Sequence, residues 1–484
     1  MSLRRARSLR RWQREVPLTL SLSFPIIAGM LAHMLVGLAD TIMVGRVGVV
    51  PLAAASFVNA IVHLPMVLGI GLLSSVAVLG SQAFGARQSA AAGEVLRHGL
   101  VVAMGAGVLT IGVLACLLPL LSCFGQPPEV VAASGTYLML FGGSMLPMLV
   151  AHACKQFSEA LNRPWPPNFI LLAGVLLNVG LNWVLIYGHW GAPALGLEGA
   201  GWATLISRVA MAVCLVAYVT CAPTLRPFQP VRWWTAFSAG QFGRLLRLGW
   251  PVAAQHLLEV SAFVFAALMM GWISADAIAA HQIAITCAAT TFMFGLGVGM
   301  ATCIRVGHAW GASQLARMRR IGFVGIALAG GVMAVFAVVF VVGREPIARL
   351  FITSPAVIQL TAQLLLVAAI FQIADGVQIG AISALRGLTD VRVPALIAAL
   401  AYWFIAVPMG AALGFAGGLG AVGIWIGLAT GLGVAAVSLL WRFHRKSRGA
   451  GQSANGEWQL PNASNVVAGS DSEYEMSQDG SQKS

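Results

Sequence analysis

The sequence predicts an all-α polytopic membrane protein with twelve transmembrane helices arranged in two halves of six. Three observations lead to this fold class. The chain has 484 residues, of which 58% are hydrophobic and only 9% are charged, and its mean hydropathy is +0.85, which is far more apolar than soluble globular domains. Apolar runs long enough to cross a bilayer recur along the chain. Basic residues gather in alternate links between these runs.

The apolar runs define the expected spans and the division of the chain. A basic tail over 1–15 is followed by an N-terminal half over 16–222, a linker over 223–245 and a C-terminal half over 246–446. Residues 447–484 change to Gly, Ser, Asn, Gln and acids, which is typical of a disordered tail. The expected spans are 16–44, 53–80, 95–123, 133–158, 165–190, 199–222, 246–272, 279–305, 320–343, 357–385, 393–415 and 421–443.

Arginine and lysine predict the orientation of these spans. The even-numbered links, which follow spans two, four, six, eight and ten, hold most of the basic residues of the links. The odd-numbered links contain only Arg46, Arg344 and Arg349. Because basic residues favour the cytoplasmic side of a membrane, we expect both termini and the linker in the cytoplasm.

One pattern occurs twice at a constant spacing and without a gap. Because each half contains six spans, an even number, both halves have the same orientation in the membrane. We therefore expect a pseudo-two-fold axis along the membrane normal to relate them. Two of the repeated residues, Pro25 and Pro251, fall in the first helix of each half, where proline bends a helix as a static kink or as a hinge. The first copy contains Pro25, Gly45, Gly69, Gly71, Gly85 and Ala86, and the second contains Pro251, Gly271, Gly295, Gly297, Gly311 and Ala312.

Composition also limits the classes of function. The net charge is +13, but the basic residues lie between spans, so we expect no nucleic-acid partner. The seven cysteines lie in or beside spans without metal-ligand spacing, and no paired catalytic motif is present. We therefore expect no metal cofactor and no enzyme. Arg208, Arg305 and His308 lie near span ends, where long side chains reach toward the interface.

Three acids, Asp40, Glu259 and Asp375, are the only ones predicted to lie well inside spans. A charged side chain at the bilayer centre costs a few kcal/mol, so such acids face a cavity, pair with another group or hold a proton. A buried acid that gains and loses a proton can carry it, whereas carboxylate and amide oxygens together can hold Na⁺. Duplicated spans with acids at this depth are typical of ion-coupled transporters.

In the N-terminal half, Asp40 lies near the outer end of span one, in Asp40-Thr41-Ile42-Met43-Val44-Gly45. Asn178 and Asn182 are four residues apart in span five and therefore share a helical face. The two amides either join neighbouring helices or form an ion site with Asp40. Thr204 in span six is a further candidate.

In the C-terminal half, Glu259 lies in span seven, one turn after Gln255. Asp375 lies in span ten and shares a helical face with Phe371 and Gln378. A carboxylate beside an aromatic ring attracts metal or organic cations. The alternative for Asp375 is a structural ion pair with a neighbouring Arg or His.

At these residues the chain resembles the multidrug and toxic compound extrusion (MATE) family over roughly residues 15–445. Acids at Glu259 and Asp375 are similar to those of its NorM-type bacterial branch, whereas the DinF-type branch typically lacks the pair. The motifs that carry the resemblance are Asp40 to Gly45, Pro51 to Ala54, Gly80 to Ala86, Asn178 to Asn182 and Leu385 to Asp390.

The resemblance implies two six-helix lobes arranged as a V, which export cationic amphipathic compounds in exchange for Na⁺ or H⁺ by alternating access. It implies that Glu259, Asp375 and Phe371 form a cation site in the C-lobe, and that Asp40 with the two asparagines forms a second site in the N-lobe. Some relatives have an acid in place of Asn182. We expect a monomer in the bacterial inner membrane, with lipid and cationic drugs as its partners and no cofactor besides the coupling ion.

Two other transporter classes compete with this interpretation. Major facilitators also have six plus six spans, but the link after span two, Gly85-Ala86-Arg87-Gln88-Ser89, lacks their usual G-x-x-x-D-x-x-G-R-[RK] motif. A flippase for lipid-linked glycans, or for another hydrophobic anionic cargo, shares the wider superfamily fold. Acids in the cavity suit cationic cargo better, because a potential complementary to the ligand favours binding.

Overall fold

The computed structural model describes residues 2–230, 233 and 238–449. The regular structure of this part of the chain is helical, and it contains twelve helical segments long and apolar enough to cross a membrane, which confirms the predicted fold class. Most spans are single α-helices: α1 (Ser2–Gly45), α2 (Val49–Gly85), α3 (Ser89–Leu117), α6 (Trp165–Tyr187), α7 (Leu197–Cys221), α8 (Ala239–Ile273), α9 (Ala275–Gly311), α10 (Leu315–Phe351), α11 (Pro355–Gly387) and α14 (Gly420–Gly449).

Two spans are interrupted. Span four breaks at Ser144 into α4 (Pro128–Gly143) and α5 (Met145–Ala160). Span eleven contains two π-helical segments, and π-helical turns often occur at functional sites. Its parts are α12 (Arg392–Leu400), η4 (Ala401–Ala406), α13 (Val407–Ala411) and η5 (Ala412–Ala416). Elsewhere, three short 3₁₀ helices connect other elements: η1 (Leu118–Phe124), η2 (His189–Gly191) and η3 (Arg226–Phe228).

Several helices extend beyond the apolar runs that predicted them. α1 begins at Ser2 rather than near residue 16, and α8 begins at Ala239 rather than near 246. The segments that precede the apolar runs, 2–15 and 239–245, contain no proline, so the helix continues through them, and α1 also passes through Pro17 just inside its run. The predicted disordered tail, 447–484, lies outside the described residues except for the last turn of α14.

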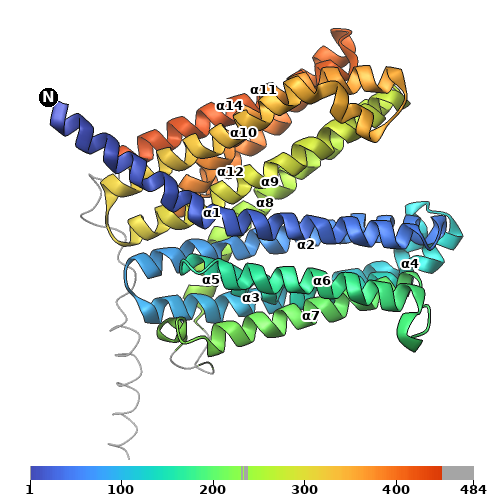
Figure 1. Cartoon of the computed structure of the whole chain (residues 1–484), viewed down its shortest axis with the longest axis horizontal. Coiled ribbons are helices and arrows are strands. Elements are labelled where there is room, and N and C mark those ends of the chain that lie inside the picture. The colour runs from blue at the N-terminus through green and yellow to red at the C-terminus, as the bar shows by residue number, and fades with distance from the viewer. Residues whose placement is uncertain (1, 231–232, 234–237, 450–484) are drawn as a thin grey trace, which may run out of the picture.

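The helices form two bundles, α1–α7 and α8–α14, which spread apart toward one end of the molecule as a V (Figure 1). They meet mainly where α2 packs on α8 and α9, and where α1 packs on α9. We call the end that holds the turns after α2 and α9 the closed end, because the polar contacts between the lobes are found there.

The repeated glycines explain how the lobes approach so closely. A Cβ atom on Gly85 would lie 2.1 Å from the carbonyl oxygen of His308, and one on Gly311 would lie 2.0 Å from that of Gln82. Gln82 and His308 occupy equivalent positions in the two copies. The contacts are therefore exchanged by the pseudo-two-fold axis, and only glycine lets the two backbones touch at both places.

A second glycine pair repeats this arrangement deeper in the membrane. A Cβ atom on Gly71 would lie 2.4 Å from Cα of Ala253, and one on Gly297 would lie 2.3 Å from Cγ1 of Ile27. Ile27 and Ala253 are again equivalent positions of the two copies. The sequence repeat thus corresponds to a symmetric interface between the lobes.

Polar contacts join the lobes at the closed end. Glu15 of α1 forms an ion pair and a short hydrogen bond with Arg305 of α9, and a second ion pair with Arg317 of α10 at 3.3 Å. Gln82 donates to the carbonyl oxygen of Gly387 at 2.9 Å, and His308 donates to that of Ala160 at 2.6 Å.

The expectation that Arg305 and His308 only extend toward the membrane–water boundary is therefore wrong, because both bind groups of the N-lobe.

Candidate functional site

The C-lobe brings Glu259, Gln378 and Tyr402 together from α8, α11 and the π-helical segment η4. The hydroxyl of Tyr402 lies 3.1 Å from Oε1 of Glu259 and 3.2 Å from Nε2 of Gln378. A hydroxyl has one proton, so the consistent pattern is that Tyr402 donates to the carboxylate and accepts from the amide. The π-helical turn places this hydroxyl on the face of span eleven that meets Glu259.

Asp375 lies one turn before Gln378 on α11 and is 5% exposed. Among the described residues it has neither a hydrogen bond nor an ion pair, so the alternative of a structural pair with Arg or His is not found there. It interacts electrostatically with Glu259. Two acids of like charge in one buried site repel each other unless a proton or a cation lies between them.

An aromatic cluster adjoins the two acids. Phe371 is 3% exposed, and its ring lies 6.1 Å from that of Phe263 and 5.8 Å from that of Trp425, measured between centroids. Phe263 in turn contacts Tyr402 at 6.0 Å. The aromatic rings therefore lie beside Tyr402, which binds Glu259 and Gln378, so oxygen atoms and aromatic rings meet at this site.

Gln255 lies one turn before Glu259, and its oxygen accepts a hydrogen bond from Arg386 at 3.2 Å. The sequence places Arg386 in a link between spans, but its side chain is 8% exposed and its charge acts on Glu259. A fixed cation thus lies near Glu259, and Gln255 helps to orient it.

The N-lobe site is a chain of amides that ends on Asp40. The amide nitrogen of Asn182 donates to Oδ1 of Asp40 and lies 3.2 Å from Oδ1 of Asn178. The amide nitrogen of Asn178 in turn donates to the hydroxyl of Ser207 at 3.4 Å. The predicted shared face of the two asparagines is therefore directed at the acid. The hydroxyl of Thr204 and the amide oxygen of Asn182 are buried without a partner among the described residues, which leaves oxygen atoms for a bound ion.

Arg208 is a site residue that the sequence interpretation missed. It lies in the middle of α7, donates to the hydroxyl of Ser144 at 2.8 Å, and stacks over Phe141 at 4.7 Å. Its charge acts on Asp40 and on the Tyr137 hydroxyl. Arg208 therefore does not simply reach toward the interface. The Ser144 hydroxyl that orients Arg208 is buried at the break between α4 and α5. The position of Arg208 near the centre of an apolar run was the available signal.

One further acid that the sequence interpretation did not single out is fully buried near the end of span four. Glu159 of α5 is fully buried, pairs with Lys155 at 3.1 Å, and accepts from Asn168 at 3.4 Å. Lys155 compensates its charge one turn away on the same helix. This arrangement is a structural ion pair, unlike the two acids of the C-lobe.

The two prolines lie inside continuous helices, since α1 passes through Pro25 and α8 through Pro251. A hinge at either residue stays a prediction. Among the described residues there is no cluster of three His, Cys, Asp or Glu side chains that would hold a transition metal. The oxygen-rich set around Glu259 and Asp375 suits a hard cation instead.

Comparison with known proteins identifies the family. The MatE family model matches residues 25–184 and again residues 251–412, so the two matches begin at the repeated prolines. The chain belongs to the MatE family. This family consists of transporters, not of enzymes, which confirms both the resemblance and the expectation that the chain is not an enzyme.

Relatives match over nearly the whole chain. A protein of Rhodopseudomonas palustris named probable multidrug resistance protein NorM is 40% identical, with 91% of this chain and 94% of the relative covered. A protein of the same name from Bradyrhizobium diazoefficiens is 37% identical, with 89% and 93% covered.

Solved structures share the fold. A mutant of the Vibrio cholerae MATE transporter VcmN superposes with a TM-score of 0.83 at 22% identity, covering 91% of this chain and 98% of that one. The eukaryotic MATE transporter AtDTX14 gives a TM-score of 0.81 at 19% identity, with 91% and 99% covered. At these identities the likeness concerns the architecture.

Proposed function

We propose that this chain exports cationic amphipathic compounds from the cell by antiport with Na⁺ or H⁺. The observation that carries the proposal is the pair of Glu259 and Asp375: Glu259 is half-buried, Asp375 is buried, and no described residue forms an ion pair with Asp375. Such a pair gains most from a proton or a small cation. The names of the bacterial relatives, which designate multidrug resistance proteins, support the cargo class.

The N-lobe differs from the C-lobe in its charge. Asp40 has Arg208 nearby, and Asn182 supplies an amide where a second acid would add charge. In the C-lobe, by contrast, no described cation pairs with Asp375. We therefore assign the main coupling role to Glu259 and Asp375, and a supporting role to Asp40.

The mechanism is competition within alternating access. If the even-numbered links are cytoplasmic, the closed end faces the cytoplasm and the V opens outward (Figure 1). Cations that enter from outside would neutralise Glu259 and Asp375 and release bound cationic drug. Drug that binds after the closed end opens would favour loss of the cation inside, because such coupling is reciprocal in binding free energy. We propose that the chain performs this role as a monomer in the bacterial inner membrane, with both termini in the cytoplasm.

The test is ethidium efflux from vesicles that contain the full chain, with Na⁺ and pH gradients imposed separately. Efflux driven by Na⁺ alone would assign a metal-cation site to the two acids, and efflux driven by the pH gradient alone would make them proton carriers. Glu129→Gln is a matched control, because this exposed acid at the start of α4 lies outside both sites. A lack of response to either gradient, with protein confirmed in the membrane, would contradict the proposal and favour a flippase for hydrophobic anionic cargo.

A further inference from the structure

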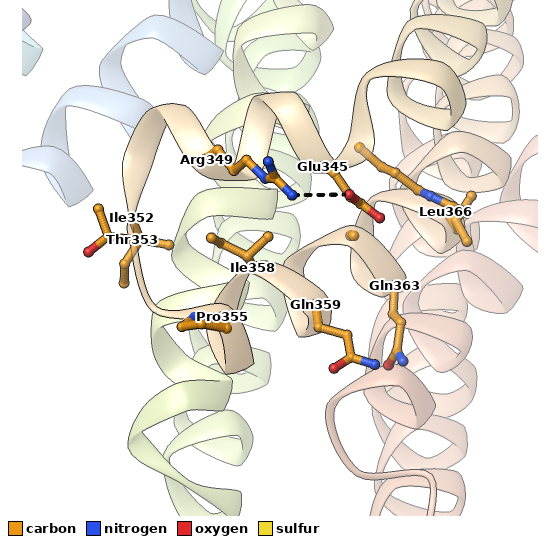
Figure 2. A pocket seen from close by; sticks show the side chains of 11 residues that line it. Glu345, Arg349, Ile352, Thr353, Pro355, Ile358, Gln359, Gln363 and Leu366 are labelled. Atoms are coloured by element: carbon orange, nitrogen blue, oxygen red, sulfur yellow. Dashed lines mark ion pairs between the residues drawn. The ribbon is translucent and has the colours of Figure 1, made fainter.

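The outer ends of α10 and α11 enclose a pocket of about 720 Å³, which lies within the usual volume range of small-ligand sites. Its polar side chains come from both helices and the turn between them: Arg344, Glu345 and Arg349 from α10, Thr353 from the turn, and Gln359 and Gln363 from α11. Figure 2 shows the two glutamines on one side of the pocket and the ion-paired Arg349 and Glu345 on the other. None of these residues belongs to the sites described above.

The charges of the pocket leave one cation without a partner. Arg349 lies 3.6 Å from Glu345. Arg344, however, is half-buried and forms neither an ion pair nor a hydrogen bond among the described residues. The cluster therefore has a single net positive charge, directed at a pocket that also contains amide donors.

The surface next to the pocket is apolar. Val338 and Val342 continue the α10 stripe toward the membrane centre and are 63% and 77% exposed. Leu366 and Ile370 continue the stripe of the two glutamines on α11, and Ile370 is 70% exposed. Polar residues at the helix ends thus pass into an apolar surface one to two turns deeper.

The depth of the pocket corresponds to the membrane–water boundary. α10 has 37 residues, so it is about 55 Å long at 1.5 Å per residue. The hydrocarbon core is about 30 Å thick, which leaves roughly 12 Å of a centred helix outside it at each end. Arg344 is about 10 Å from the end of α10 at Phe351, so the arginines lie at the level of lipid headgroups.

We infer that this pocket binds an anionic phospholipid of the adjoining leaflet. The single phosphodiester charge would neutralise Arg344 and Arg349, whose planar guanidinium groups match phosphate oxygens. Headgroup hydroxyls would bind the amides of Gln359 and Gln363, and an acyl chain would cover Val338, Val342 and Ile370. This site is independent of the proposed drug export and of the identity of the coupling ion.

The experiment is native mass spectrometry of the detergent-purified full chain, titrated with phosphatidylglycerol or with phosphatidylethanolamine of the same acyl chains. We expect phosphatidylglycerol to bind more tightly. We expect Arg344→Gln with Arg349→Gln to weaken its binding by about fivefold for each arginine removed. Arg46→Gln, at an exposed arginine outside the pocket, should have no effect.

Glu345→Gln separates a lost site from a damaged fold. It removes the negative charge and should tighten phosphatidylglycerol binding about twofold or more, a gain that misfolding would not produce. Equal binding of phosphatidylglycerol to the wild type and to the double arginine variant would overturn the inference. Full competition by soluble sn-glycerol 3-phosphate would also overturn it, because it would assign the pocket to a free phosphate.

Discussion

Replacing Gly311 by alanine tests whether the repeated glycines hold the closed end together. The new Cβ would lie 2.0 Å from the carbonyl oxygen of Gln82, whereas real Cβ atoms essentially never approach an atom more closely than 3.0 Å. The backbones of α2 and α9 must therefore separate by about 1 Å, because a carbonyl oxygen within a helix cannot rotate away.

The cost of this separation determines the size of the effect. Overpacking costs about 1–3 kcal/mol. The upper end applies here because the nearest atoms to the new Cβ, the carbonyl oxygen and carbon of Gln82, belong to the backbone. About 3 kcal/mol shifts the ratio of closed to open conformations at this end about 150-fold. Gly85→Ala, which meets the carbonyl oxygen of His308 at 2.1 Å, should have the same consequence, and the two changes should not add because they share one interface.

Spin-label distance measurements would report the separation. The labels are placed at Ala90→Cys and Gln314→Cys after the exposed native cysteines Cys116, Cys123, Cys214 and Cys221 are replaced by serine. The two labelled positions lie on opposite lobes at the closed end, and both are exposed. We expect Gly311→Ala to lengthen and broaden the distance distribution and to lower ethidium efflux. Gly331→Ala on α10 is the control, because a Cβ there has no atom within 4 Å. A wild-type distribution and wild-type efflux in Gly311→Ala would refute the reasoning.

The remaining predictions concern the two acid sites. Glu259→Gln and Asp375→Asn should each abolish export while leaving membrane insertion intact, as measured by drug resistance and expression beside Glu129→Gln; full resistance in either would refute its role. Asp40→Asn should reduce efflux, and intact transport would mean that the C-lobe alone performs the coupling. Tyr402→Phe removes the hydroxyl that binds Glu259, so the half-saturating concentration of the driving cation should rise about tenfold; an unchanged value would show that the hydroxyl does not support the site.

The fold was largely predictable because the membrane imposes it. Apolar runs fix the number of spans, and the position of arginine predicts their orientation. The repeat starting at Pro25 and Pro251 predicted two related lobes, and the same two residues begin the family matches. The V shape followed from the resemblance, because hydropathy does not report how two bundles are tilted.

The site was predictable only in part, since pairings between distant helices depend on packing. The acids could be found because charge inside an apolar run is rare. The partners could not: Glu15 and Arg305 are 290 residues apart, and Tyr402, which binds Glu259, lies in a π-helical segment that hydropathy does not indicate. The break at Ser144 did have a signal, because Pro147 cannot donate a hydrogen bond to the carbonyl of Gly143, but the pairing of Ser144 with Arg208 across the helices had none.

The symmetric interface and the asymmetric sites place different limits on how this chain can diverge. A larger side chain at Gly85 or Gly311 would clash with the other lobe, because each glycine touches the backbone of that lobe at an equivalent position. Glu259, by contrast, corresponds to His33 in the first copy, so the two lobes already hold different chemistry at matching places. After a gene duplication, one lobe could therefore acquire a new set of binding residues while the symmetric interface between the lobes stayed unchanged. Variation among relatives should then concentrate within the lobes.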